Sequence, residues 1–110
     1  MEQECLFCQI IAGQRPADVV YEDEAVLAFK DVNPHAPVHV LIVPKTHIRS
    51  INDLTEEDGP IVAAMIMRAR SLARALRVDR SGYKLQINVE RGAGQVIFHL
   101  HMHLVGGWRQ

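Results

Sequence analysis

The sequence predicts an α+β domain with a mostly antiparallel five-stranded sheet, one long helix and one short helix. Short apolar stretches between turn-forming residues indicate the strands. A single stretch is both long and helically periodic, which indicates one long helix. Only the connection between the strands expected at residues 38–43 and 83–89 contains a helix, so a doubly wound parallel sheet is excluded.

The first half of the chain carries the short helix and three strands. Residues 5–12 hold four apolar side chains at helical spacing. Residues 19–22 and 25–29 are apolar runs on either side of an Asp-Glu pair, which indicates a hairpin. A loop with two prolines then leads to an apolar strand at residues 38–43.

The long helix opens the second half and is expected to end near Leu76. Two starts fit the sequence: Thr55 can act as a cap with Asp58 three residues on, and Pro60 suits an early helical position counted from Asp58. Its apolar stripe predicts the core face: Ile61, Met65, Ala69, Leu72 and Leu76. The arginines lie off this stripe and indicate a solvated face.

Two more strands follow the helix. Residues 83–89 alternate apolar and polar side chains, as a half-buried strand does. The last strand is expected over residues 97–105, after a glycine-containing loop at 90–95 and before a glycine pair.

Composition limits the class of protein. The 110 residues are 48% hydrophobic, which predicts one domain over residues 1–110 with a core of its own and excludes a disordered chain. Twelve basic residues face 13 acidic ones, for a net charge of -1, so no nucleic-acid partner is expected. The longest apolar run, residues 61–67, is too short to span a membrane, and the acidic start lacks the features of a secretory signal. We therefore expect a cytoplasmic protein with no membrane partner.

Three histidines alternate with apolar residues in the last strand: His99, His101 and His103. Alternation along a strand places them on one face. A merely solvated face would accept other polar residues equally well, so the pattern favours chemistry, either at a metal or by nucleophilic attack. A neutral imidazole is a good nucleophile at pH 7. The preceding glycine loop can bring backbone N–H groups close to a phosphate.

Cys5 and Cys8 form a Cys-x-x-Cys pair. A reducing compartment disfavours a structural disulfide, and no strand precedes the pair as a thioredoxin-like motif requires. Two thiolates with two histidines would make a closed tetrahedral zinc site, whereas the simpler alternative is a pair of small buried thiols.

Residues 94–107 resemble the signature of the histidine-triad (HIT) family, specifically the Hint branch of nucleoside phosphoramidate hydrolases. The likeness extends through residues 7–11, 27–34 and 36–48, and so covers nearly the whole chain. It implies hydrolysis of the P–N bond of purine nucleoside phosphoramidates, such as AMP-linked amines, through a nucleotidyl-histidine intermediate. It also implies a homodimer and no organic cofactor.

The resemblance also implies roles for individual residues. His101 corresponds to the nucleophile, His103 to a phosphate contact and His39 to a proton relay, with His99 as the first histidine of the triad. The implied nucleotide-binding residues are Phe7, Ile10, Phe29, Asp31, Val32, Asn88, Gly94, Gln95 and Val96. The implied ligands of a structural zinc ion are Cys5, Cys8, His47 and His99. The physics agrees at the ribose, because two hydroxyls suit one carboxylate acceptor.

Other interpretations stay open at this point. Asp31 could instead cap the turn before Asn33, and His35 is expected at the surface. Val96 replaces the serine or threonine that many Hint relatives carry, and the chain has no long segment after its glycine pair, so leaving-group specificity is open. The rival functions are a Fhit-like dinucleoside polyphosphate hydrolase, a non-catalytic nucleotide-binding module and a zinc-dependent interaction domain.

Overall fold

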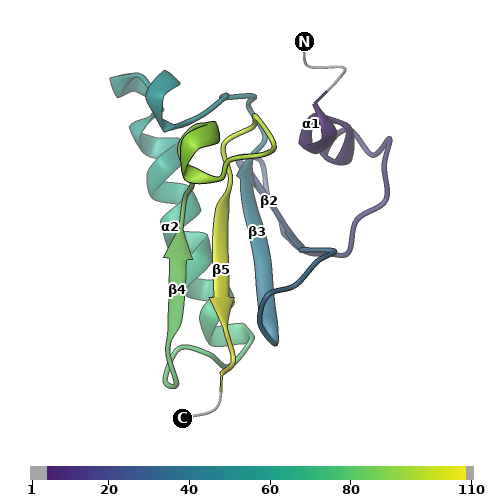
Figure 1. Ribbon diagram of the computed structural model, residues 1–110, viewed down its shortest axis with the longest axis vertical. Coiled ribbons are helices and arrows are strands. Elements are labelled where there is room, and N and C mark those ends of the chain that lie inside the picture. The colour runs from purple at the N-terminus through teal and green to yellow at the C-terminus, as the bar shows by residue number, and fades with distance from the viewer. Residues whose placement is uncertain (1–4, 109–110) are drawn as a thin grey trace.

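Five short strands form one antiparallel sheet in the order β1-β2-β3-β5-β4 (Figure 1). The computed structural model describes residues 5–108. The strands are β1 (Val19–Glu22), β2 (Val26–Lys30), β3 (Val38–Pro44), β4 (Tyr83–Gln86) and β5 (Met102–Gly106). The helices are α1 (Leu6–Ile11) and α2 (Gly59–Ala75), with 3-10 turns η2 (Ile51–Asp53), η3 (Glu56–Asp58) and η4 (Arg91–Ala93). The predicted α+β class is confirmed.

β5 is the last strand of the described chain, yet it lies inside the sheet between β3 and β4. β3 leads through α2 to β4, and β5 then pairs antiparallel with both strands. In this register His103 lies opposite Leu41 on one side and Gln86 on the other. The strand with the histidine motif is therefore held at both edges. Within residues 5–108, no helix is long and apolar enough to cross a membrane.

The start of α2 uses both of the signals found in the sequence. The Thr55 amide donates to the Asp58 carboxylate at 2.9 Å, and this contact caps the short turn η3. Asp58 is then the N-cap of α2, with a proline in its first turn. The two predicted starts thus belong to two consecutive elements.

The two faces of the sheet bury different clusters. One face packs against α2 and contains Val26, Ala28, Val40, Ile42, Met102 and Leu104 together with Met65, Ala69, Leu72 and Ala73 of the helix. The other face packs against α1 and contains Phe7, Leu27, Phe29, Leu41 and Val43. Because strand residues alternate, His39 and His103 fall on the α1 face. The predicted site therefore lies on the α1 face of the sheet.

The last two strands are shorter than the sequence predicts. β5 begins at Met102 rather than at residue 97, and β4 ends at Gln86 rather than at residue 89. The neighbouring part of β3 cannot continue the ladder, because Pro44 has no N–H and its carbonyl oxygen accepts from the His99 ring at 2.8 Å. The Leu100 amide bonds to the Ile48 carbonyl instead, at 2.6 Å. His99 and His101 therefore lie on irregular backbone before the strand.

Candidate functional site

A cavity of about 610 Å³ lies between α1 and the α1 face of the sheet. Three of the predicted catalytic histidines line it: His39, His101 and His103. Eight of the nine predicted nucleotide-binding residues line it too: Phe7, Ile10, Phe29, Asp31, Val32, Asn88, Gly94 and Val96. The volume is within the usual range for a small-molecule site.

His101 presents a single ring nitrogen to the cavity it lines. Its Nδ1 lies 2.7 Å from the backbone carbonyl oxygen of His99, which can only accept a hydrogen bond. Nδ1 therefore carries the proton, and in the neutral ring the lone pair is on Nε2. This side chain is almost fully buried. An oriented neutral imidazole of this kind is able to act as a nucleophile.

His39 and His103 form a hydrogen-bonded pair beside His101. The backbone amide of His35 donates to His39 Nδ1 at 3.0 Å, so the neutral His39 ring carries its proton on Nε2. That N–H lies 2.9 Å from His103 Nδ1, compared with 3.4 Å from the Asp31 carboxylate. His103 Nδ1 therefore accepts, and its Nε2–H is the donor.

The environment keeps all three imidazoles neutral near pH 7. Burial lowers the pKa of His101 below its ordinary 6.5, despite a raising effect from the His99 carbonyl and Asp31. Burial also lowers the pKa of His39, although Asp31 opposes the shift. The pKa of His103 is lowered to about 4 by burial first and then by the neighbouring imidazoles. The 3.4 Å contact between His39 Nε2 and the Asp31 carboxylate is consequently not an ion pair at neutral pH.

The two carboxylate oxygens of Asp31 make different contacts. Its Oδ1 accepts from the Asn33 amide at 2.8 Å, so the turn-capping alternative is correct as far as it goes. Its Oδ2 faces His39, and the side chain lines the cavity. A carboxylate has about four acceptor positions, so the turn contact leaves room for a ligand's hydroxyl groups.

The turn at residues 90–95 shapes one end of the cavity. Gly94 has φ +93°, a backbone angle that glycine adopts readily, and it lies beside the Asn88 side chain. Val96 is 81% exposed and contributes to the cavity wall. This end offers backbone and amide groups rather than charge.

Gln95 is the one predicted nucleotide-binding residue that does not line the cavity, and its contact with a nucleotide stays a prediction. Its side chain is 1% exposed and does not line the cavity. The amide oxygen accepts from the Glu90 N–H at 2.8 Å, and the amide nitrogen donates to the carbonyls of Arg49 and Ile97. Glu90 has φ +69°, so this buried amide stabilises an uncommon backbone conformation. Gln95 shapes the loop from inside.

His35 borders the cavity, a position that the residue pattern did not indicate. Its side chain is exposed, as predicted, but it also lines the cavity, and its ring centre lies 5.4 Å from that of His39. Its backbone amide determines the His39 tautomer. A main-chain contact across a proline-bounded loop leaves no signal in the residue pattern.

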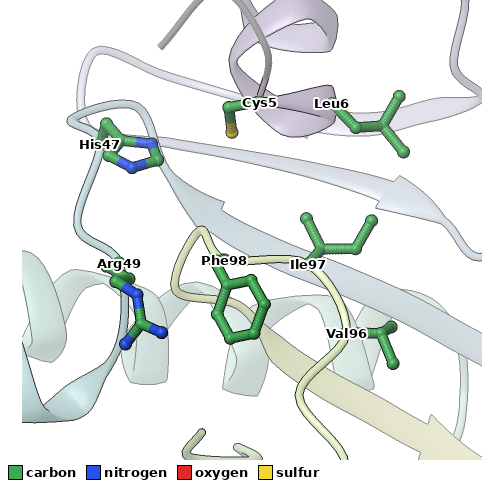
Figure 2. A pocket seen from close by; sticks show the side chains of 7 residues that line it. All are labelled: Cys5, Leu6, His47, Arg49, Val96, Ile97 and Phe98. Carbon is green, nitrogen blue, oxygen red and sulfur yellow. The ribbon is translucent and has the colours of Figure 1, made fainter. Parts of the chain in front are cut away.

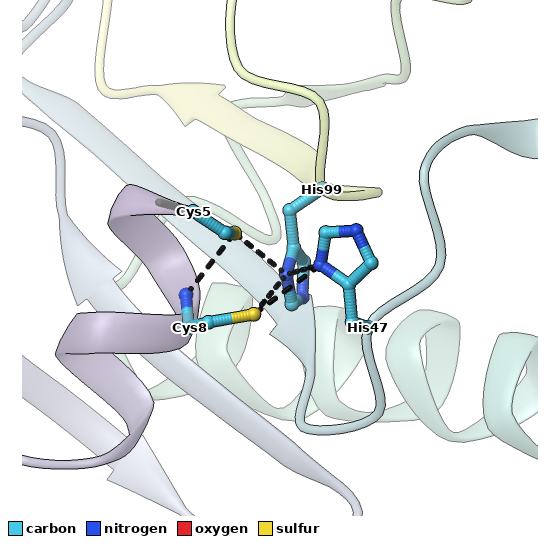
Figure 3. Close-up of side chains that lie close together, drawn as sticks. All are labelled: Cys5, Cys8, His47 and His99. Carbon is cyan, nitrogen blue, oxygen red and sulfur yellow. Dashed lines mark hydrogen bonds between the residues drawn. The ribbon is translucent and has the colours of Figure 1, made fainter. Parts of the chain in front are cut away.

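The two cysteines lie together with two histidines at the N-terminal end of α1 (Figure 3). Cys8 Sγ is 3.2 Å from His47 Nδ1, Cys5 Sγ is 3.4 Å from His99 Nδ1, and the two Nδ1 atoms are 3.2 Å apart. The cysteines are not joined in a disulfide. All four potential ligand atoms lie within 4.8 Å of one another.

These four residues fit a zinc ion. Tetrahedral zinc with nitrogen and sulfur ligands spaces them about 3.3 to 3.8 Å apart, close to the contacts observed. The His99 Nε2–H donates to the Pro44 carbonyl at 2.8 Å, so the lone pair on Nδ1 faces the sulfurs. A backbone acceptor on the far nitrogen is what metal-bound histidines have. His99 is fully buried and does not line the cavity, so the structure places it with the cysteines rather than with the catalytic histidines.

A second cluster, Asp31 with His39 and His103, also brings three potential ligand atoms within 4.8 Å. Metal on His39 Nε2 would require the proton on Nδ1. The His35 amide already donates to Nδ1, so two donors would then face each other. The backbone thus favours hydrogen bonding in this cluster and metal binding in the other.

A second hollow, of about 420 Å³, adjoins the cavity (Figure 2). The two share three lining side chains: Leu6, Val96 and Ile97. At its other side the Arg49 guanidinium lies 4.6 Å from the centre of the Phe98 ring and pairs with Glu90. Phe98 belongs to neither apolar cluster, and the face of its ring contacts the Arg49 cation instead.

Comparison with known proteins agrees with this fold. Residues 4–108 match the family described as scavenger mRNA decapping enzyme C-term binding. The chain is 40% identical over 107 residues to the purine nucleoside phosphoramidase of Escherichia coli K12. The matched residues cover 97% of this chain and 90% of that one. The chain belongs to the histidine-triad family.

Solved structures of that family superimpose closely. The HIT family hydrolase from Legionella pneumophila Philadelphia 1 has a TM-score of 0.95 and 47% identity, covering 96% of this chain and 95% of that one. A Zn-bound histidine triad family protein from Mycobacterium smegmatis has a TM-score of 0.83 and 35% identity, covering 99% and 78%. The predicted family is confirmed.

The pKa of His103 generates a prediction about pH. In the folded protein we expect this ring to stay neutral until the pH falls to about 4, whereas in the unfolded chain it takes up its proton near 6.5. The free energy of unfolding should therefore decrease as the pH is lowered from 6.5 towards 4, with no contribution from this group above 6.5. NMR titration of the imidazole signals, assigned with His103→Asn, measures the midpoint. A midpoint near 6.5 in the folded protein would contradict the buried neutral pair.

Proposed function

We propose that this chain hydrolyses the P–N bond of purine nucleoside phosphoramidates, with AMP-linked amines as substrates. The observation that carries the proposal is the orientation of His101, a buried neutral imidazole whose remaining lone pair is available in an apolar-walled cavity beside a carboxylate. The relative named purine nucleoside phosphoramidase supports the same reaction.

In the proposed binding mode the base lies between aromatic and aliphatic walls. The Phe7 and Phe29 rings meet edge to face at 5.4 Å, and Ile10 and Leu41 complete an apolar end of the cavity. The ribose hydroxyls bond to Asp31, and the phosphate lies near Asn88 and Gly94. Apolar walls with a few placed polar groups are typical of nucleotide-sized sites.

The proposed reaction has two displacements at phosphorus. His101 Nε2 attacks the α-phosphorus, the P–N bond breaks, and the amine leaves with the electron pair of that bond and takes up a proton from solvent. Water then attacks the nucleotidyl-histidine and gives up a proton to solvent, the bond from phosphorus to His101 breaks, and AMP is released. His103, whose Nε2–H is the donor of its pair, hydrogen-bonds a phosphate oxygen, and His39 supports its orientation.

We further propose that Cys5, Cys8, His47 and His99 hold a structural zinc ion. When bound, it would join the N-terminal helix to the end of β3 and to the segment that carries the nucleophile. Four protein ligands leave no position for water or phosphate, so we assign it no part in the chemistry. The Zn-bound relative supports the proposal.

The homodimer and the cytoplasmic location stay predictions, as do the lack of an organic cofactor and of nucleic-acid or membrane partners. The two edges of the sheet, β1 and β4, carry the exposed apolar side chains Val19 and Leu85. These supply apolar surface to which a second copy could pair.

Incubation with adenosine 5′-phosphoramidate should release AMP. His101→Ala should lower turnover roughly 10⁴-fold or more while AMP affinity stays within about twofold, because the variant loses the attacking atom but not the binding walls. Labelled phosphate should be trapped on the wild type and not on the variant. AMP binding without turnover by the wild type would favour the non-catalytic module, and substantial hydrolysis by His101→Ala would reject the covalent route.

Asp31 should discriminate ribose from its deoxygenated form. AMP should bind at least ~1 kcal/mol more tightly than 2′,3′-dideoxy-AMP, because the carboxylate loses charge-assisted hydrogen bonds with the analogue. Asp31→Asn is a matched control, since its amide oxygen can still accept from Asn33 while the charge is gone. In this variant the affinity difference between AMP and 2′,3′-dideoxy-AMP should be smaller than in the wild type. Equal affinities for the wild type would leave turn capping as the only role of Asp31.

Purified protein should carry about one zinc ion per chain, and Cys8→Ser should lose it. Removal by a chelator should lower the melting temperature, because the metal joins elements from distant parts of the sequence. Turnover at saturating substrate should be kept by the protein that remains folded. Metal analysis with calorimetry tests this. A metal-free wild type of unchanged stability would reduce the cysteines to packing, and zinc that takes phosphate as a ligand would contradict a closed site.

A further inference from the structure

The helix α1 contributes to two sites at once. Cys5, at its N-cap, and Cys8 belong to the metal cluster, whereas Phe7 and Ile10 line the nucleotide cavity. Both pairs have a spacing of three residues, which keeps the members of a pair on one side of a helix, and the pairs are offset by two positions, which turns them to different sides. One short element therefore connects two candidate ligands.

Phe7 is the contact between the two sites. Its ring centre lies 6.0 Å from that of His99 in the metal cluster and 5.1 Å from that of His101 in the cavity. It also meets Phe29, the facing wall of the base end, at 5.4 Å. A change in the position of α1 would move this ring relative to all three.

A few side chains attach α1 to the sheet. Phe7 is its one fully buried residue, and Leu6, Ile10 and Ile11 are half-buried against the same cluster. The following residues 12–16 are exposed and belong to no helix or strand. Figure 1 shows a long connection between α1 and the first strands of the sheet. Figure 3 shows the second attachment, the thiol–imidazole contacts to His47 and His99. His99 is anchored independently of α1, through the Pro44 carbonyl.

We propose that metal binding at the cysteine cluster and nucleotide binding in the cavity are positively coupled through α1, with Phe7 as the positioning residue. This inference rests on the proposed nucleotide site and the proposed zinc ion. Either ligand orders α1 over the sheet, and the second then binds to a helix that is already in place. Linkage makes the effect reciprocal: zinc strengthens nucleotide binding by the same factor by which nucleotide strengthens zinc binding.

The coupling acts on binding and not on the chemical step. His101 is oriented by the His99 carbonyl, and His103 by the His39 ring, so neither hydrogen bond involves α1. Loss of the metal should therefore raise KM and leave kcat nearly unchanged. A merely structural zinc ion would lower the melting temperature without changing the affinity of the folded protein for nucleotide.

The test is titration calorimetry of AMP into the full chain, zinc-loaded and zinc-free, at a temperature where circular dichroism shows both forms folded. AMP should bind at least about fivefold more weakly to the zinc-free form, the lower end of usual allosteric coupling. Competition against a chromophoric chelator, with and without saturating AMP, should give the same factor for zinc. Unequal factors, equal AMP affinities in the two forms or failure to bind zinc would overturn the inference.

Two variants separate coupling from general stability. Phe7→Leu keeps all four metal ligands but removes the ring, so it should still bind zinc, and AMP affinity should no longer respond to the metal. Leu72→Ala, in the α2 cluster on the opposite face, should lower the melting temperature through a cavity yet keep the zinc response. If zinc strengthens AMP binding to Phe7→Leu by the same factor as in the wild type, the role of Phe7 is overturned. Absence of AMP binding in both forms of the wild type overturns the proposed function as well, whereas equal binding overturns the coupling alone.

Discussion

A backbone group holds one ring nitrogen of three of the histidines on which the site depends. The His99 carbonyl holds Nδ1 of His101, the Pro44 carbonyl holds Nε2 of His99, and the His35 amide holds Nδ1 of His39. Carbonyls only accept and amides only donate, so each contact decides where the proton of a neutral ring resides. The tautomers follow from the fold and do not depend on a ligand.

The same constraint separates two chemistries that use one residue type. The Pro44 carbonyl accepts from Nε2 of His99, so the lone pair on Nδ1 faces the cysteines and is available to a metal. An amide behind His39 leaves an N–H towards His103, which suits hydrogen bonding and proton transfer. Both clusters bring ligand atoms equally close, so distance does not distinguish them. The polarity of the backbone partner does.

The sheet supplies the rigidity that these contacts need. β5 lies between β3 and β4, and its apolar residues pack against α2. His103 is therefore positioned by ladder bonds on both sides, while the opposite face carries only the small α1 cluster. Tight packing on one face and the smaller α1 cluster on the other leave space for a ligand without loosening the strand that holds His103.

Most of the fold is readable from the residues. Alternation predicted the strands, the apolar stripe predicted the buried face of α2, and the order of elements excluded a doubly wound sheet. These features depend on local periodicity, which burial on one face imposes on any strand or helix. The boundaries of β4 and β5 were not readable, because they depend on where a neighbouring strand stops offering ladder partners at Pro44.

The site divides in the same way. The sequence by itself determined which residue types were available: three alternating histidines, a Cys-x-x-Cys pair, a carboxylate before Asn33 and a glycine-containing loop. Only the tertiary structure decided which ring nitrogen His99 turns towards the cysteines, that Gln95 turns inward and that His35 borders the cavity. Each of these depends on a hydrogen bond to a main-chain atom distant along the chain or across a loop. Every residue has such atoms, so no residue pattern marks them in advance.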